Sequence, residues 1–110
     1  MAYPKVTILN LCGLRAKGTV GYLSWFCSDD NYTVDPNNTW EAPGRGTCLV
    51  TKITAMVGEV FAKPYESSGT SYSKFAIIKL PDGSYMVTRL TTGSEDKPPE
   101  DYTEPTEKQK

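Results

Sequence analysis

Aromatic and small polar side chains gather in two stretches of the sequence, one around Trp40 and one between Tyr65 and Tyr72. The first reads NNTWE and the second reads YESSGTSY. A flat aromatic ring stacks on the apolar face of a pyranose, while amide, hydroxyl and carboxylate groups bond to its hydroxyls. These stretches therefore predict a lectin-like site that binds carbohydrate or a glycoprotein. The residues assigned to this ligand-binding site are Asp30, Asn38, Trp40, Tyr65, Glu66 and Tyr72.

Two other functions use the same residue types. Tyr, Ser, Gly and Asn are typical of adaptable protein-binding loops, so residues 65–72 also fit a protease inhibitor or a secreted effector. A membrane-active β-sandwich toxin is the third hypothesis, because Trp and Tyr favour the depth of lipid headgroups. Composition alone does not separate the three, and we rank carbohydrate binding first. The aromatic belt of a toxin would consist of Trp25, Phe26, Trp40, Tyr65 and Tyr72.

Catalysis has little support in the sequence. The chain has no histidine, the side chain that most often serves as a base near neutral pH. A serine or cysteine nucleophile would therefore need a carboxylate or a lysine as its base. We expect a non-enzymatic protein that uses no cofactor.

Metal and anion sites are also weakly indicated. Asp29, Asp30 and Asp35 offer the oxygen ligands that calcium prefers, but their spacing matches no calcium-binding loop. We favour a solvated turn and predict no metal site. Residues 44–46, GRG, could hold an anion, because glycine allows close approach and arginine binds oxyanions in a bidentate manner. Here too we favour a plain turn before a strand.

The chain has three cysteines, Cys12, Cys27 and Cys48. An odd number leaves open one disulfide with one free thiol, and the sequence does not say which two would pair. We favour three small core residues, since cysteine is among the most buried residue types. Their spacing and the lack of histidine match no zinc site.

One domain, residues 1–93, is expected to precede an acidic tail at 94–110. The tail has six acidic and three basic residues, three prolines and only Tyr102 as a large apolar group. It cannot bury enough surface to offset the entropy of ordering, so we predict that it is disordered. Residues 1–93 hold nine basic and seven acidic residues, scattered singly, which argues against nucleic-acid binding. With no signal-peptide pattern and no long apolar run, a secreted or a cytoplasmic location both remain open.

Alternation of apolar and polar residues predicts several strands. The longest alternating run is residues 46–57, GTCLVTKITAMV, which we expect to form one central strand. Shorter strands are expected at residues 5–11, 18–27, 32–34 and 59–65, with turns at 28–31 and 35–38 and a loop at 65–72. Pro36 suits the second position of a type I turn. Two further runs, 73–80 and 84–91, flank Pro81, Asp82 and Gly83 and predict a β-hairpin.

These six to eight short strands, without helical periodicity, predict an all-β fold, an antiparallel β-sandwich. Its edge strands leave a homodimer open. A membrane surface is retained as an alternative partner, and nucleic acid is not expected. The predicted core residues are Ile8, Val20, Tyr22, Leu49, Ile53, Val57, Phe75, Ile77 and Val87.

Overall fold

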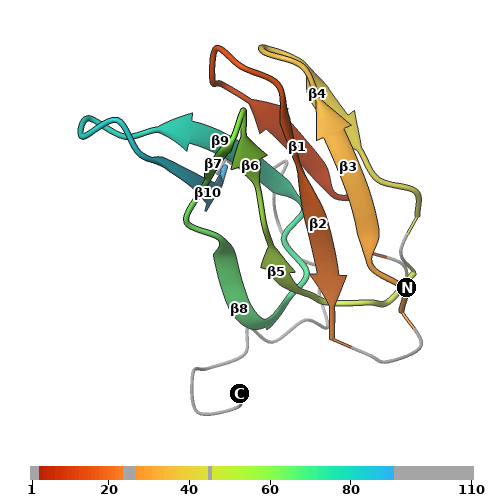
Figure 1. Ribbon diagram of the computed structural model, residues 1–110. Helices are drawn as coiled ribbons and strands as arrows, with labels where there is room; N and C mark the ends of the chain where they lie inside the picture. Colours follow the sequence, from red (N-terminus) through yellow and green to blue (C-terminus); the bar gives the residue numbers. More distant parts are fainter. Residues whose placement is uncertain (1–2, 24–26, 45, 91–110) are drawn as a thin grey trace.

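The computed structural model describes residues 3–23, 27–44 and 46–90 of the 110 residues. In this part of the chain two β-sheets pack face to face, which confirms the predicted all-β sandwich (Figure 1). The described residues contain no helix, and hence none long and apolar enough to cross a membrane. The predicted disordered tail, residues 94–110, lies outside the described residues.

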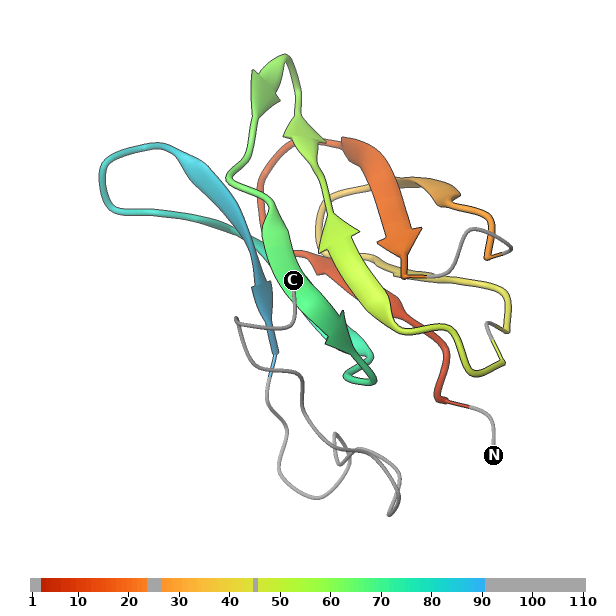
Figure 2. The ribbon, with the colours of Figure 1, turned by 90° about the horizontal axis from the view of Figure 1, so that it is seen from below.

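The smaller sheet has the order β10-β9-β1-β4, and the larger has the order β7-β6-β2-β5-β8 with β3 paired to β2. β1 runs parallel to β9, whereas the other pairs of strands are antiparallel. β8 and β10 lie side by side where the two sheets meet (Figure 2). The bounds are β1 Thr7–Asn10, β2 Ala16–Tyr22, β3 Asp30–Val34, β4 Thr39–Glu41, β5 Val50–Ile53, β6 Met56–Val57, β7 Val60–Phe61, β8 Tyr65–Thr70, β9 Lys74–Lys79 and β10 Tyr85–Arg89.

The core between the sheets contains most of the residues predicted for it. Two predicted core residues, Tyr22 and Leu49, are only half-buried, and Val50 is fully buried instead of Leu49. The cause is a bulge in β5 beside Thr51, where the register with β2 shifts, so that the simple alternation of faces fails. The predicted residues that are buried are Ile8, Val20, Ile53, Val57, Phe75, Ile77 and Val87.

The predicted central strand, residues 46–57, is shorter than expected and split into β5 and β6. Both pieces pair with β2 in one continuous register, with Ile53 opposite Val20 and Met56 opposite Lys17. The split falls at Thr54 and Ala55. The prediction of a strand central to its sheet is correct for β5, which lies between β2 and β8.

A hydrogen bond from Tyr32 explains this split. The Tyr32 hydroxyl on β3 donates to the Thr54 carbonyl at 2.5 Å, across Gly18 of β2. A Cβ atom at position 18 would overlap that carbonyl, so only glycine leaves the path open. The Thr19 amide, which faces Thr54 in the register, instead donates to Thr54 Oγ1 at 3.0 Å. The Thr54 amide keeps its ladder bond to the Thr19 carbonyl at 2.9 Å. One ladder bond is therefore replaced by two side-chain bonds.

The prediction of a loop at residues 65–72 is wrong, because residues 65–70 form β8. Its small polar residues give a weak strand signal, but their side chains are bonded locally. The Ser67 hydroxyl donates to the Val50 carbonyl at 2.7 Å, and Ser67 Oγ accepts from the Gly69 amide at 3.1 Å. β8 has extra residues relative to β5 at this point, which is a bulge that hydrophobic patterning does not reveal.

The predicted strand at 59–65 is present only as the short β7, Val60–Phe61, which forms a tight hairpin with β6. Gly58 has a φ of 60° and, with Glu59, connects β6 to β7. Met56 lies opposite Phe61 in this hairpin. Glycine tolerates the positive φ that a two-residue hairpin turn requires.

The other turns agree better with the sequence. The hairpin of β9 and β10 is confirmed, with a φ of 90° at Gly83 and a bond from its amide to the Leu80 carbonyl at 2.9 Å. Asp82 accepts hydrogen bonds from the Ser84 hydroxyl and amide, which lower the pKa of its carboxyl. The turn at residues 35–38 is also present. Asn37 has a φ of 62° at its third position, which belongs to a type II turn and not to the predicted type I.

Replacing Tyr32 by phenylalanine removes the hydroxyl and keeps the ring. We expect Tyr32→Phe to lower the free energy of unfolding by about 1–3 kcal/mol, because the Thr54 carbonyl loses its partner. Urea unfolding measures this difference. Tyr85→Phe is the matched control, since the half-buried Tyr85 packs against the core and no hydrogen bond of its hydroxyl is seen among the described residues. Equal losses in the two variants would contradict the role assigned to Tyr32.

The stabilisation measured with Tyr32→Phe should also depend on pH. Burial raises the pKa of the Tyr32 hydroxyl above its usual range, so the folded state holds this proton more tightly than the unfolded state. The stability that results is present below the unfolded-state pKa of about 10 and is lost as the pH rises above it. The difference in unfolding free energy between the wild type and Tyr32→Phe should therefore shrink above about pH 10. If this difference in unfolding free energy stays constant above about pH 10, the predicted pH dependence is wrong.

Candidate ligand-binding groove

The structure does not bring the six predicted site residues together. Trp40 and Asn38 lie at the β4 edge of the smaller sheet. Trp40 is half-buried and packs on Tyr32, with ring centroids 5.2 Å apart and planes tilted by 35°. Asn38 is exposed in the turn before β4. The Trp40 ring is therefore committed to a contact between the two sheets.

Tyr65 and Tyr72 also make intramolecular ring contacts. Tyr65 on β8 packs on Phe75 of β9 with ring centroids 4.8 Å apart, a second contact between the sheets. The Arg89 guanidinium lies 3.4 Å above the centre of the Tyr72 ring, a cation–π arrangement. Three members of the aromatic belt predicted for a toxin, Trp40, Tyr65 and Tyr72, thus each pack on a different partner within the protein. The other two members, Trp25 and Phe26, lie outside the described residues, as does Arg45 of the predicted anion-binding turn.

The acidic residues are spread along β3. Asp30 opens this strand, although residues 28–31 were predicted as a turn, and Asp35 follows its other end. Asp35 forms an ion pair with Arg15 Nε at 2.7 Å. Asp30 and Asp35 are five residues apart along an extended strand, a backbone separation of about 16 Å, which is too far for them to share an ion. Among the described residues no three acidic or cysteine side chains are grouped to hold a metal ion.

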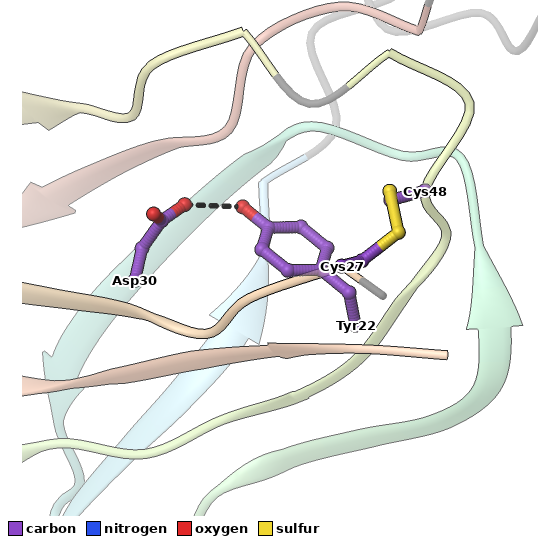
Figure 3. The surroundings of a disulfide bond; sticks show 4 residues. All are labelled: Tyr22, Cys27, Asp30 and Cys48. Carbon is purple, nitrogen blue, oxygen red and sulfur yellow. Dashed lines mark hydrogen bonds between the residues drawn. A yellow bond between two sulfur atoms is a disulfide. The ribbon is translucent and has the colours of Figure 1, made fainter. Parts of the chain in front are cut away.

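A disulfide joins Cys27 and Cys48, so the favoured prediction of three unpaired thiols is wrong. The bridge links the segment before β3 to the segment before β5, and a small hollow lies beside it. Tyr22 extends past the disulfide and donates its hydroxyl to Asp30 at 2.7 Å (Figure 3). Cys12 is free and buried, and burial raises the pKa of its thiol, partly offset by the charge of Lys79.

Removing the disulfide tests its role in holding these segments. We expect the double variant Cys27→Ser/Cys48→Ser to lose about 3 kcal/mol of stability, because the bridge no longer restricts the unfolded chain. Thermal unfolding with and without a phosphine reductant measures this. The reductant should lower the melting temperature of the wild type and leave that of the double variant unchanged. A reductant-insensitive wild type would contradict the prediction.

A larger hollow lies on the outer face of the larger sheet, the face turned away from the core. We call it the outer groove, and its volume is about 410 Å³. It runs across four strands, β3, β2, β6 and β7, which spans about 14 Å. Its side chains form two cross-strand rows. The first row is Thr33, Lys17, Met56 and Phe61, and the second is Asn31, Thr19 and Thr54.

The side chains of this groove combine an open aromatic ring with polar groups that have few partners. Phe61 is 80% exposed, the most exposed of the large apolar side chains described. Thr19 and Thr54 share a hydrogen bond of 3.1 Å between their hydroxyls, which leaves one of the two protons free. Within the described residues the side chains of Lys17, Asn31 and Thr33 make no hydrogen bond or ion pair. The groove therefore offers donors and acceptors beside a flat apolar surface.

None of the six predicted site residues lines the outer groove. Glu66 on β8 forms an ion pair with Lys52 of β5 at 3.8 Å. Phe61 and the row around Thr19 were missed. Phe61 was predicted within a strand of its own, where nothing indicated that it would face the other strands. One sequence signal was available, since Lys17, Thr19, Asn31 and Thr33 are the outward residues of two neighbouring strands.

No protein-family model matches the chain, and the comparisons with curated proteins and with solved structures find no match. The function proposed below is therefore derived from the chemistry of the outer groove.

Proposed function

We propose that this chain is a non-enzymatic binding module that recognises carbohydrate in the outer groove. The observation that carries this proposal is the exposed Phe61 ring beside the side chains of Lys17, Asn31 and Thr33, which make no hydrogen bond or ion pair among the described residues. A pyranose presents an apolar face of C–H groups and a rim of hydroxyls, and each hydroxyl is both donor and acceptor. The Phe61 ring can stack on the C–H face of the pyranose, and the hydroxyl, amide and ammonium groups can form hydrogen bonds with its hydroxyls.

The size and stiffness of the groove support the same function. Its volume lies in the range of about 300–1,000 Å³ that small-molecule sites occupy. Most of its side chains project from paired strands, so their positions are fixed before a ligand arrives. A preorganised site loses less entropy on binding than a mobile loop does. Protein binding through residues 65–72 has less support, because that segment is mostly β8 and not a loop.

Removing the Phe61 ring tests the proposal. We expect Phe61→Ala to weaken glycan binding about tenfold or more, which corresponds to ~1.4 kcal/mol, because the stacking surface is lost. A glycan array with the tagged protein identifies the bound glycans, and calorimetric titration with the strongest of them measures the loss.

Val60→Ala is the matched control for this experiment. Val60 lies on the same short strand and is 51% exposed, but it points to the opposite face. The Val60→Ala variant should therefore bind glycans as strongly as the wild type does. A wild-type protein that binds no glycan on the array, or a Phe61→Ala variant that binds as the wild type does, would refute the proposal.

Membrane contact is a second candidate, supported by exposed apolar residues at one end of the sandwich. Leu14, in the connection between β1 and β2, is 53% exposed and packs close to Gly58 at the tip of the β6–β7 hairpin. The Gly58 amide donates to the Arg15 carbonyl at 3.0 Å, which joins the two segments. Leu14, Val60 and Phe61 thus form an exposed apolar end that a lipid surface could cover.

Vesicle sedimentation separates the two candidates. If the apolar end contacts membranes, the wild type should sediment with phosphatidylcholine–phosphatidylserine vesicles, and Leu14→Asn should reduce this binding because it places an amide among the apolar side chains. Glycan binding should be unchanged in Leu14→Asn, since Leu14 does not line the groove. A wild type that stays in solution beside such vesicles would exclude this candidate and leave the carbohydrate proposal intact.

A further inference from the structure

A second hollow continues the outer groove along β2. It has a volume of about 210 Å³, and Thr19 and Thr54 line both hollows. Its other lining residues are Gly21, Asp29 and Lys52. Thr19 and Gly21 are two residues apart on the outer face of one strand, a step of about 7 Å. The two hollows therefore form one continuous depression on the sheet.

Gly21 is the floor of this second hollow. It lies opposite Lys52 of β5, and Lys52 lies opposite Glu66 of β8. A Cβ atom at position 21 would lie 3.7 Å from Asp29 Oδ1 and 3.7 Å from Thr51 Oγ1, which is ordinary van der Waals contact. A methyl group would fit there without a clash and would occupy space between Asp29 and Lys52. Glycine keeps that space open.

The charges around Gly21 limit what can bind there. Lys52 Nζ is 3.8 Å from Glu66 Oε2, and both side chains are about half exposed. Asp29 makes no ion pair or side-chain hydrogen bond among the described residues, so its carboxylate can accept from two neighbouring hydroxyls. Two carboxylates beside one ammonium would repel an anionic sugar and accept a neutral one.

We propose that the two hollows are consecutive subsites for a linear, neutral oligosaccharide. In the outer groove Phe61 stacks on one sugar unit. In the second hollow, Asp29 accepts from hydroxyls of a following unit, and Lys52 donates to its oxygens. This inference rests on the proposed function and adds the length and the charge of the bound glycan.

Chain-length series test this inference. The probes are cello-, manno-, chito- and malto-oligosaccharides from the monosaccharide to the hexasaccharide, with oligogalacturonates of the same lengths as anionic counterparts. For at least one neutral series, calorimetric titration should show an affinity that rises about tenfold between the disaccharide and the tetrasaccharide. The oligogalacturonates should bind more weakly than that series at the lengths that reach the second hollow.

Gly21→Val fills the second hollow and leaves Phe61 untouched. This variant should bind the disaccharide as the wild type does and should lose the tenfold rise. Gly21→Ala should lose part of it. Gly13→Ala is the control, because a Cβ atom at position 13 meets nothing within 4 Å, and it should keep the full rise. Thermal unfolding of each variant confirms that it is folded.

The outcomes separate this inference from the proposed function. If the wild type binds in a Phe61-dependent manner and Gly21→Val keeps the full rise, the second subsite is refuted and the carbohydrate proposal stands. Equal binding of oligogalacturonates and neutral chains refutes the charge assignment in the same way. If the wild type binds none of these probes and no glycan on the array, both are refuted.

Discussion

The bond from Tyr32 to the Thr54 carbonyl is the constraint on which the larger sheet depends. A partly buried carbonyl needs a partner, and here the partner comes from a strand two positions away in the sheet. Gly18 makes this possible because it leaves no side chain between the two strands. The Tyr32 ring also packs on Trp40 of the other sheet. One side chain therefore joins β3 to the β5–β6 connection and ties the larger sheet to the smaller.

The same constraint shapes the outer groove. Because the Thr54 carbonyl turns toward the core to meet Tyr32, the Thr54 hydroxyl takes its place as acceptor for the Thr19 amide. The two threonine hydroxyls are then held 3.1 Å apart on the outer face. Hydroxyls fixed in this way need little reorganisation to bond a ligand. A distortion that originates in the core thus orients the polar floor of the groove.

The sequence predicted the elements whose signals are local. Alternation located β1, β2 and much of the core, and Pro81, Asp82 and Gly83 located the hairpin of β9 and β10. β8 was missed because the Ser67 hydroxyl bonds to the backbone of Val50 and Gly69, a pattern unrelated to hydrophobic periodicity. The disulfide was not predictable because it joins two segments that only the fold brings together.

The structure separates the predicted site residues for a related reason. Composition selected the aromatic residues Trp40 and Tyr65 as candidate ligand-binding residues. It could not show that the Trp40 ring packs on Tyr32 and the Tyr65 ring on Phe75, both between the sheets. Phe61 reaches the groove only through the reversal at Gly58, and that depends on a positive φ.

The two glycines inside β2 were a more useful signal than the aromatic residues. A glycine in a strand interior costs about 0.5–1 kcal/mol relative to alanine, so its presence often marks a close approach of other groups or a space that must stay empty. Gly18 is an example of the close approach, whereas Gly21 leaves space on the surface. Gly18 faces the core, where Tyr32 crosses it. Gly21 faces outward, where the nearest atoms leave room for a methyl group that the sequence does not supply. Among the described residues no atom would lie closer than 3.7 Å to a Cβ atom at position 21, so a steric clash does not account for this glycine, which lies where the register between β2 and β5 shifts.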